Sequence, residues 1–202
     1  GAGLDAIKIE GVEKLGSVEH TIIPDRIEAG THMIAAAITA GDVLIDQIIP
    51  DHLEPISAKL IEAGVEVKKY EESVRVIAPK RVKAIDFKTL PFPGFPTDMQ
   101  PQMMALMSVA DGTSIVAESI FENRFKHIDE LRRMGANIKL EGRVAIIKGV
   151  PALSGAFVEA TDLRAGAALV LAGLVAEDAT VIEKVEYIDR GYERLEYKYT
   201  SL

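Results

Sequence analysis

Cysteine and tryptophan are absent from this 202-residue chain, and aromatic side chains make up only 5% of it. The lack of cysteine excludes disulfides, thiolate metal sites and a cysteine nucleophile within the chain, and it suits a reducing compartment. No apolar run reaches the roughly 18 residues of a membrane-spanning helix, and no charged-then-apolar signal peptide opens the chain. We therefore expect a cytoplasmic protein that does not bind a membrane.

Positive charge is also scarce, with 23 Lys and Arg against 31 Asp and Glu, a net charge of −8 and a pI of about 5.1. This balance argues against a nucleic-acid partner, because such proteins usually present a basic face. The four histidines at positions 20, 32, 52 and 127 lack the spacing of metal ligands. There is no Walker loop, no dinucleotide fingerprint and no nucleophile elbow, so familiar catalytic patterns are mostly absent.

A long repeat organises the chain. Asp25, Asp98 and Asp162 lie 73 and 64 positions apart, and each precedes apolar residues at helical spacing. A second helix start follows each of them after 26, 25 and 27 positions, at Asp51, Asn123 and Asp189. We interpret each unit as a strand, a helix, a strand, a helix and two strands. Three such units around a pseudo-threefold axis can bury their helices inside and leave their sheets outside, which predicts an α+β fold of the inside-out α/β barrel type.

The three units are predicted over residues 21–80, 91–150 and 152–202. We expect short strands at residues 5–9 and 18–23 ahead of the first helix. Gly64 and Gly135 are predicted to end the second helices of the first two units. The third unit lacks its last pair of strands, so we expect it to be incomplete.

The residues at the helix starts allow two interpretations. A carboxylate there is commonly only a cap, because the first N–H groups lack partners and the helix dipole is positive at that end. Arginine is electrostatically misplaced at the same end, yet several arginines lie at predicted helix starts: Arg26, Arg124, Arg164 and Arg190. One such Arg is explained by pairing with a neighbouring Asp. Several at equivalent repeat positions favour an anion site, since guanidinium forks and free helix N–H groups suit phosphate and carboxylate.

Five strings along the chain carry a family resemblance. They are PDRIEAGT at 24–31, FPTDMQPQ at 95–102, FENRF at 121–125, ATDLRAGAALVLAG at 160–173 and IDRGYER at 188–194. Together they resemble the UDP-N-acetylglucosamine 1-carboxyvinyltransferase family, the enolpyruvyl transferases that open bacterial peptidoglycan synthesis. The related enolpyruvyl-shikimate-phosphate synthases share the fold but not these strings, and they are kept as an alternative.

The resemblance implies a two-domain enzyme with its active site in the cleft between two threefold domains. Residues 1–20 would then be the tail of the preceding domain with the crossover, and residues 21–202 the second domain. The implied reaction moves the enolpyruvyl group of phosphoenolpyruvate onto the 3′-hydroxyl of UDP-N-acetylglucosamine, by addition and then loss of phosphate, without a cofactor. The implied partners are these two substrates and the missing partner domain of the same enzyme.

The matching positions imply roles for individual residues. Asp98 would contact the sugar hydroxyl and act as the base in the addition step. Ile120 would make a second contact to the UDP-sugar through its backbone.

Arg164 and Arg190 resemble the family's anion clamps for phosphoenolpyruvate, which fits their unusual place at helix starts. Asp162 would orient this cluster, so these three residues join Asp98 as the predicted catalytic set. Asp25 and Arg124 are implied as further substrate-binding members of the same polar cleft.

The chain also departs from the family pattern. The family's mobile loop with its acid-acting Cys lies in the other domain, and this chain has no cysteine. The pattern is also lost after Arg194. We therefore expect the chain alone not to turn over, and a non-catalytic nucleotide-sugar-binding module is the alternative to part of an enzyme.

Overall fold

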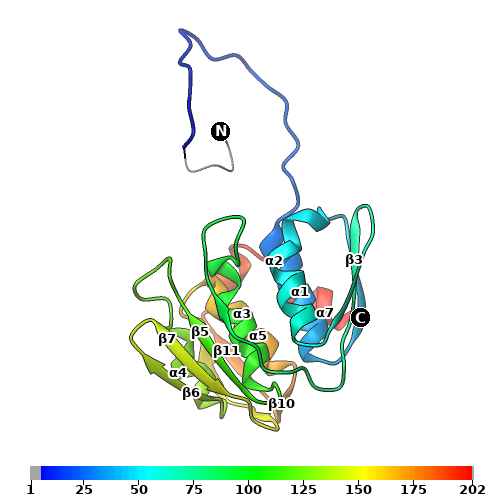
Figure 1. The fold of residues 1–202 in the computed structure, drawn as a ribbon, viewed down its shortest axis with the longest axis vertical. Helices are drawn as coiled ribbons and strands as arrows, with labels where there is room; N and C mark the ends of the chain where they lie inside the picture. Colours follow the sequence, from blue (N-terminus) through cyan, green and yellow to red (C-terminus); the bar gives the residue numbers. More distant parts are fainter. Residues whose placement is uncertain (1–5, 202) are drawn as a thin grey trace.

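Residues 6–201 are described by the computed structural model, and three similar units follow one another along them (Figure 1). The first helix begins after Asp25 because the side chain of Asp25 accepts a hydrogen bond from the N–H of Ile27 at 2.7 Å. The first unit contains α1 (Arg26–Ile38), β1 (Asp42–Asp46), the 3₁₀ helix η1 (Pro50–Leu53), α2 (Glu54–Glu62), β2 (Glu66–Lys69) and β3 (Ser73–Ile77).

The second and third units repeat this order with variations. The second contains β4 (Phe87–Lys88), the 3₁₀ helix η2 (Thr97–Met99), α3 (Gln100–Ser108), β5 (Thr113–Ala117), α4 (His127–Arg133), β6 (Asn137–Glu141) and β7 (Val144–Lys148). The third contains β8 (Leu153–Ser154), β9 (Phe157–Glu159), α5 (Leu163–Gly173), β10 (Ala176–Glu177), β11 (Val181–Glu183), α6 (Glu186–Asp189) and α7 (Leu195–Thr200). Gly64 and Gly135 follow α2 and α4 with φ of 92° and 90°, which confirms both predicted helix ends.

Each unit carries its own sheet. The first has the order β1-β3-β2 with antiparallel pairs, and the second has the order β4-β5-β7-β6 with β4 parallel to β5. The third unit has two short parallel pairs, β8 with β10 and β9 with β11. In β3 the buried Val74 and Val76 flank the exposed Arg75, so one face of the sheet packs inward and the other faces solvent.

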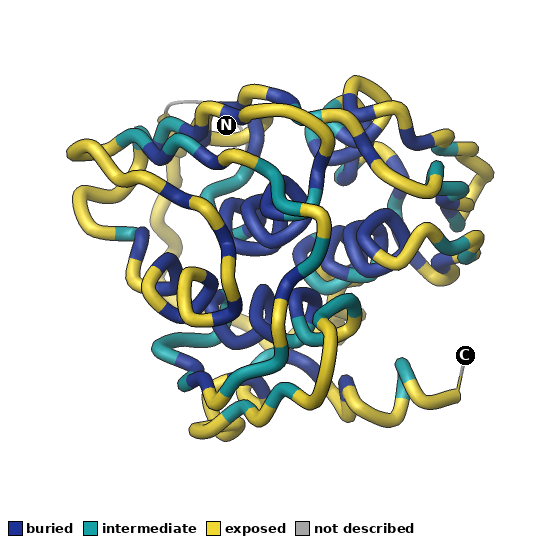
Figure 2. The backbone as a smooth tube through the Cα atoms, turned by 90° about the horizontal axis from the view of Figure 1, so that it is seen from below, coloured by how far each residue is buried: buried dark blue, intermediate teal, exposed yellow. Residues whose placement is uncertain are grey.

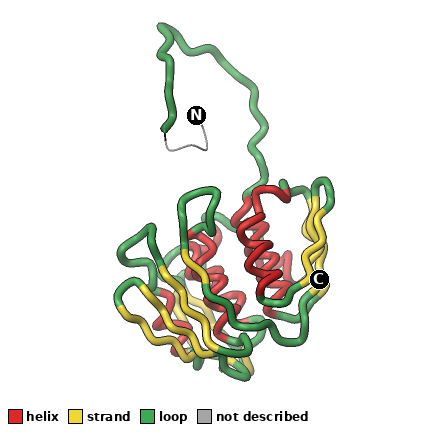
Figure 3. The backbone as a smooth tube through the Cα atoms, viewed as in Figure 1, coloured by secondary structure: helices red, strands yellow, loops and turns green. Residues whose placement is uncertain are grey.

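The first helices of the three units form the centre of the molecule. α3 packs against α5, and α1 packs against both. Every residue of α3 is buried, because this helix is enclosed on all sides rather than on one face. Figure 3 shows the helices at the centre and the strands toward the outside, and Figure 2 shows the buried central helices within a ring of exposed chain. The predicted inside-out arrangement is therefore confirmed.

The N-terminal segment differs from the prediction. Residues 6–24 lead away from the body without helix or strand, and Ile9, Val18 and Ile22 are more than 80% exposed (Figure 1). The strands predicted at 5–9 and 18–23 are therefore wrong over the described residues, and Asp5 lies outside them. The pattern of alternating apolar residues does not produce a strand here because, among residues 6–201, no strand pairs with this segment to accept its backbone hydrogen bonds.

The second helix of the third unit also begins later than predicted. Asp189 ends α6 and Arg190 follows it, so the prediction that this pair opens a helix is wrong. The second helix is α7, which contacts α1 through a hydrogen bond from Lys198 to Glu28 at 2.5 Å. In the same way the second helix of the second unit, α4, packs against α5, the first helix of the third unit. Among the helices within residues 6–201, none has the length and hydropathy to cross a bilayer.

Candidate active site

The carboxylate of Asp98 is the point at which several predicted site residues meet. Asp98 lies in η2 at the entrance to α3, but its side chain does not cap either helix. Its Oδ1 accepts a hydrogen bond from Nη2 of Arg124 at 2.6 Å, and its Oδ2 accepts from Nη2 and Nε of Arg164 at 3.2 and 3.3 Å. The interpretation as a simple cap is therefore wrong for Asp98, whereas Asp25 and Asp162 do cap α1 and α5.

Three separate segments bring this cluster together. Asp98 comes from η2, Arg124 from the loop between β5 and α4, and Arg164 from the first turn of α5. The side chains of Arg164 and Arg124 are 13% and 21% exposed, and that of Asp98 is 38% exposed. The guanidinium groups are thus mostly enclosed while the carboxylate is accessible. A ligand can reach Asp98 from solvent and meet the two cations at once.

Asp162 supports the cluster through the backbone of α5. Its Oδ1 accepts hydrogen bonds from the N–H groups of Arg164 and Ala165, both at 2.9 Å. Because these donors are two of the unpaired N–H groups of the helix start, the cap fixes the turn from which Arg164 projects. Asp162 therefore positions Arg164 through the backbone N–H of Arg164. Among the ion pairs of residues 6–201, none joins Asp162 to the Arg164 guanidinium group.

Tyr192 packs against Arg164, although the sequence does not predict it as a site residue. Its side chain is 1% exposed, its ring centre is 5.7 Å from the guanidinium carbon, and its hydroxyl accepts a hydrogen bond from Nη1 of Arg164 at 3.4 Å. Burial disfavours the charged guanidinium, but Tyr192 and Asp98 outweigh this effect and raise the pKa of Arg164 above its usual value.

The same tyrosine joins the three central helices. Its hydroxyl shares a hydrogen bond with Oγ1 of Thr31 in α1 at 2.9 Å. Nε2 of Gln102 in α3 donates to the Tyr192 hydroxyl and to Thr31 Oγ1 at 3.3 and 3.2 Å. A buried polar network therefore connects α1 and α3 to Arg164 in α5, and it ties the site to the helix packing.

Other predicted residues lie outside the cluster. Arg190 is exposed and its side chain makes no hydrogen bond or ion pair with the part of the chain that the structure describes, although its neighbour Gly191 packs on Leu163 at the start of α5. Asp25 caps α1 and pairs with none of the cluster residues described. Ile120 is 36% exposed in the loop after β5, and its N–H donates to Oε1 of Glu118 at 2.7 Å. Its carbonyl and side chain are the groups left for a ligand.

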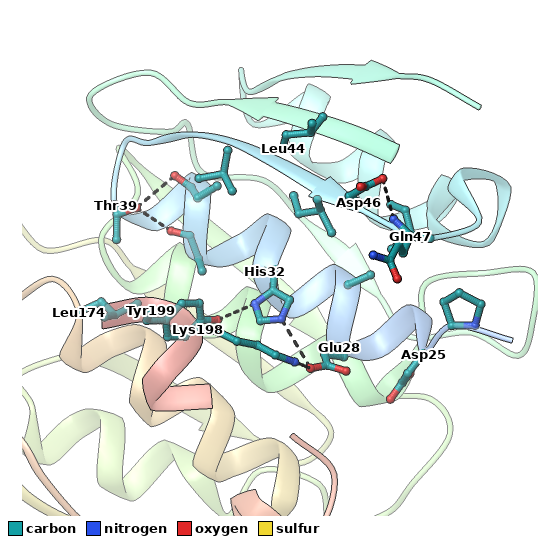
Figure 4. A pocket seen from close by; sticks show the side chains of 17 residues that line it. Asp25, Glu28, His32, Thr39, Leu44, Asp46, Gln47, Leu174, Lys198 and Tyr199 are labelled. Atoms are coloured by element: carbon teal, nitrogen blue, oxygen red, sulfur yellow. Dashed lines mark hydrogen bonds and ion pairs between the residues drawn. The ribbon is translucent and has the colours of Figure 1, made fainter. Parts of the chain in front are cut away.

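A pocket of about 690 Å³ lies apart from the Asp98 cluster, between α1, β1 and α7 (Figure 4). On one wall Lys198 donates to Glu28, and His32 Nδ1 shares a hydrogen bond with the Tyr199 hydroxyl at 3.1 Å. The pKa of Glu28 is lowered to about 2, first by His32 and then, against the opposing effect of burial, by Lys198. Asp98, Arg124 and Arg164 are not among the residues that line this pocket, so we place the candidate active site at Asp98, where these three predicted site residues meet. Across residues 6–201 no three His, Asp or Glu side chains gather in a way that could hold a metal ion.

Comparison with known proteins defines the class. The sequence model of the EPSP synthase (3-phosphoshikimate 1-carboxyvinyltransferase) family matches residues 2–199. The chain belongs to this family of enolpyruvyl transferases. It is similar within the family to the UDP-N-acetylglucosamine 1-carboxyvinyltransferase 1 of Symbiobacterium thermophilum, at 62% identity over 202 residues that cover 100% of this chain and 46% of the relative. The UDP-N-acetylglucosamine 1-carboxyvinyltransferase of Desulfofundulus thermocisternus is 63% identical over 203 residues, which cover 100% of this chain and 84% of that protein.

These matches confirm the resemblance inferred from the five strings. The chain spans about half the length of several curated relatives it matches. The family match runs to residue 199, so it extends past Arg194, where the pattern was expected to end.

Solved structures agree on the fold. The enolpyruvyl transferase NikO from Streptomyces tendae has a TM-score of 0.82 at 28% identity and covers 91% of this chain and 44% of its own. An EPSP synthase from Acinetobacter baumannii has a TM-score of 0.74 at 17% identity, over 89% of this chain and 46% of that one.

Proposed function

We propose that this chain provides one wall of the active site of a UDP-N-acetylglucosamine enolpyruvyl transferase, which uses phosphoenolpyruvate and commits its product to peptidoglycan synthesis in the cytoplasm. The observation that carries the proposal is the Asp98 carboxylate, held between the guanidinium groups of Arg124 and Arg164 and still 38% exposed. The names of relatives at 57–63% identity support the choice of acceptor sugar.

The proposed chemistry uses the remaining acceptor capacity of Asp98. An ionised carboxylate has about four lone-pair sites, and Oδ2 of Asp98 already accepts two hydrogen bonds from Arg164, so Oδ1 can accept a further hydrogen bond beside its partner Arg124. The 3′-hydroxyl of the sugar would donate to this carboxylate and lose its proton to it as the sugar oxygen attacks C2 of phosphoenolpyruvate. An acid from the missing partner domain would protonate C3. Loss of the C3 proton and departure of phosphate from C2 would then restore the C2–C3 double bond and leave the enolpyruvyl group on the sugar oxygen.

The cations of the site suit the other substrate. Phosphoenolpyruvate brings a phosphate and a carboxylate, and guanidinium forks bind both groups bidentately. Arg164 would hold one of these anions from the α5 start that Asp162 caps. In this proposal Arg190 joins it when a ligand and the missing partner domain are present. Asp25 is a weaker candidate because it already serves as the cap of α1.

The domain arrangement is part of the proposal. Residues 1–20 would belong with a preceding threefold domain, and residues 21–202 would form the second. The missing partner domain would supply the opposite wall of the cleft. The length of the first relatives, about twice that of the matched region, supports this arrangement.

The proposal is tested with Asp98→Asn in the full polypeptide that carries this chain. We expect phosphate release from phosphoenolpyruvate and UDP-N-acetylglucosamine to fall about 100-fold or more, because a general base typically contributes ~10²–10⁴-fold. The melting temperature should change little, since asparagine keeps the shape of the side chain. Asp42→Asn is the matched control, because Asp42 also binds a guanidinium fork, that of Arg75, but on the outer sheet.

Two further outcomes separate the alternatives. Turnover with shikimate 3-phosphate in place of the nucleotide sugar would assign the enzyme to the EPSP synthase reaction. Near-normal turnover of Asp98→Asn would move the base role to another group. We also expect the isolated 202-residue chain to release no phosphate. Calorimetric titration of that chain with UDP-N-acetylglucosamine tests the alternative that it is a non-catalytic binding module.

A further inference from the structure

Glu118 is a buried carboxylate beside the site, and the proposed chemistry does not use it. It follows β5, and it is 3% exposed. Within residues 6–201 it has no ion-pair partner, and its carboxylate instead accepts four hydrogen bonds. A buried carboxylate loses its hydration, so such a set of donors is needed to offset the loss.

The four donors come from three segments around the site. Oε1 accepts from the Thr89 hydroxyl at 2.7 Å, from the N–H of Ile120 at 2.7 Å and from the N–H of Phe121 at 3.1 Å. Oε2 accepts from the hydroxyl of Thr97 at 2.9 Å. One carboxylate therefore joins the end of the β4 segment, the start of η2 and the loop after β5.

Two of these segments carry site residues. Thr97 directly precedes Asp98 in η2, so its hydroxyl anchors the residue next to the proposed base. The Ile120–Phe121 loop holds the proposed nucleotide-sugar contact and continues to Arg124, whose guanidinium group lies 5.0 Å from the ring centre of Phe121. The distance between Asp98 and the Ile120 loop thus depends on a shared attachment to Glu118.

The backbone of Glu118 is itself held in place. Its carbonyl accepts a hydrogen bond from Nε of Arg143 at 3.0 Å, and its N–H donates to the Arg143 carbonyl at 2.9 Å. Next to it, the N–H of Ser119 donates to Thr89 Oγ1 at 2.9 Å, and the Ser119 hydroxyl donates to the Thr89 carbonyl. The carboxylate therefore projects from a fixed main chain, which makes it suited to locate Thr97 and the Ile120–Phe121 loop.

We propose that Glu118 is a positioning residue that sets the spacing between the Asp98 carboxylate and the Ile120–Phe121 loop, and so places the acceptor hydroxyl on the base. This inference rests on the proposed function. In this proposal the N–H of Ile120 is occupied by its hydrogen bond to Glu118, so the ligand contacts the carbonyl or the side chain of Ile120.

The test uses Thr97→Val and Glu118→Gln in the full polypeptide that carries this chain. Thr97→Val removes one tether and keeps the side-chain shape, so kcat should fall ~10-fold with KM for UDP-N-acetylglucosamine changed less than about 2-fold, because a small displacement of a reacting group is costly. Thr97→Ser retains the hydroxyl and should stay within about 2-fold of the parent. Ser108→Ala, which removes a buried hydroxyl at the far end of α3, should leave both constants unchanged.

Amide exchange supplies a readout that does not depend on turnover. In Glu118→Gln we expect faster hydrogen exchange at Ile120 and Phe121, since the neutral amide is a weaker acceptor than the carboxylate. If the parent enzyme has no enolpyruvyl transfer activity, the proposed function fails while the exchange experiment still tests the anchoring. Unchanged kinetics in Thr97→Val, or unchanged exchange in Glu118→Gln, would overturn the positioning role. A loss of activity in Thr97→Ser as large as in Thr97→Val would overturn it too.

Discussion

Acidification should destabilise this protein through His127, the first residue of α4. The ring is 2% exposed, and its Nε2 lies 3.3 Å from the sulfur of Met104. Burial lowers the pKa of His127 to about 4, with a smaller opposing effect from Asp162 and a smaller lowering effect from Arg124. The imidazole is therefore neutral in the folded protein at pH values where an exposed histidine is charged.

The sign and size of the effect follow from proton linkage. Between about pH 6.5, the ordinary histidine value, and about pH 4, the unfolded chain binds a proton at His127 that the folded chain does not bind. The free energy of unfolding therefore falls as the pH falls through this window, and it is recovered as the pH rises. The separation of the two pKa values corresponds to ~3 kcal/mol at 1.4 kcal/mol per unit. That is a large share of the ~5–15 kcal/mol that stabilises a typical domain.

Urea unfolding at several pH values between 7.5 and 4 measures the effect, with His127→Gln as the comparison. Glutamine does not titrate, so the variant should lose the slope that His127 contributes, whatever its stability at neutral pH. Glu28 titrates in a lower window, because its pKa is lowered to about 2 and its contribution is lost as the pH falls below about 4.5. Equal pH slopes for parent and variant between pH 6.5 and 4.5 would refute the reasoning.

Two substitutions test the packing. Gly149→Ala should destabilise the protein by ~3 kcal/mol, because the new Cβ would lie 1.8 Å from the backbone oxygen of Ala110, whereas Gly11→Ala has nothing within 4 Å and should cost less than ~0.5 kcal/mol. Equal midpoints of urea unfolding for these two variants would contradict the packing argument. Tyr192→Phe should cost ~1–2 kcal/mol in the same assay, because it removes the buried hydroxyl that hydrogen-bonds to Thr31, Gln102 and Arg164. An unchanged midpoint for Tyr192→Phe would mean that the network adds nothing to stability.

Short-range signals in the sequence were sufficient for the helices. Asp25 and Asp162 predict helix starts because a carboxylate satisfies the free N–H groups next to it in sequence. Gly64 and Gly135 predict helix ends because the left-handed conformation costs glycine little. These interactions span only a few residues, so they can be read from the chain, and the repeat period then indicates the threefold arrangement.

Strands and buried partners were harder to predict. Residues 18–23 alternate like a strand, yet a strand forms only against a neighbour that the local sequence does not specify. The start of α7 was missed because Asp189 and Arg190 imitate a helix start, while they lie at the end of α6.

The starts of α1 and α5, the ends of α2 and α4, the repeat and the family membership can thus be derived from residue order alone, since caps, glycine ends and long shared strings are local properties. The grouping of Asp98 with Arg164 across 66 positions, and of Thr31 with Tyr192 across 161, arises only when the three central helices pack. Packing removes water from these groups, and each buried donor and acceptor then needs a partner, wherever in the chain that partner lies. For that reason Asp98 is a shared ion-pair partner rather than a helix cap, and Glu118 and Tyr192 contact segments that carry the candidate site.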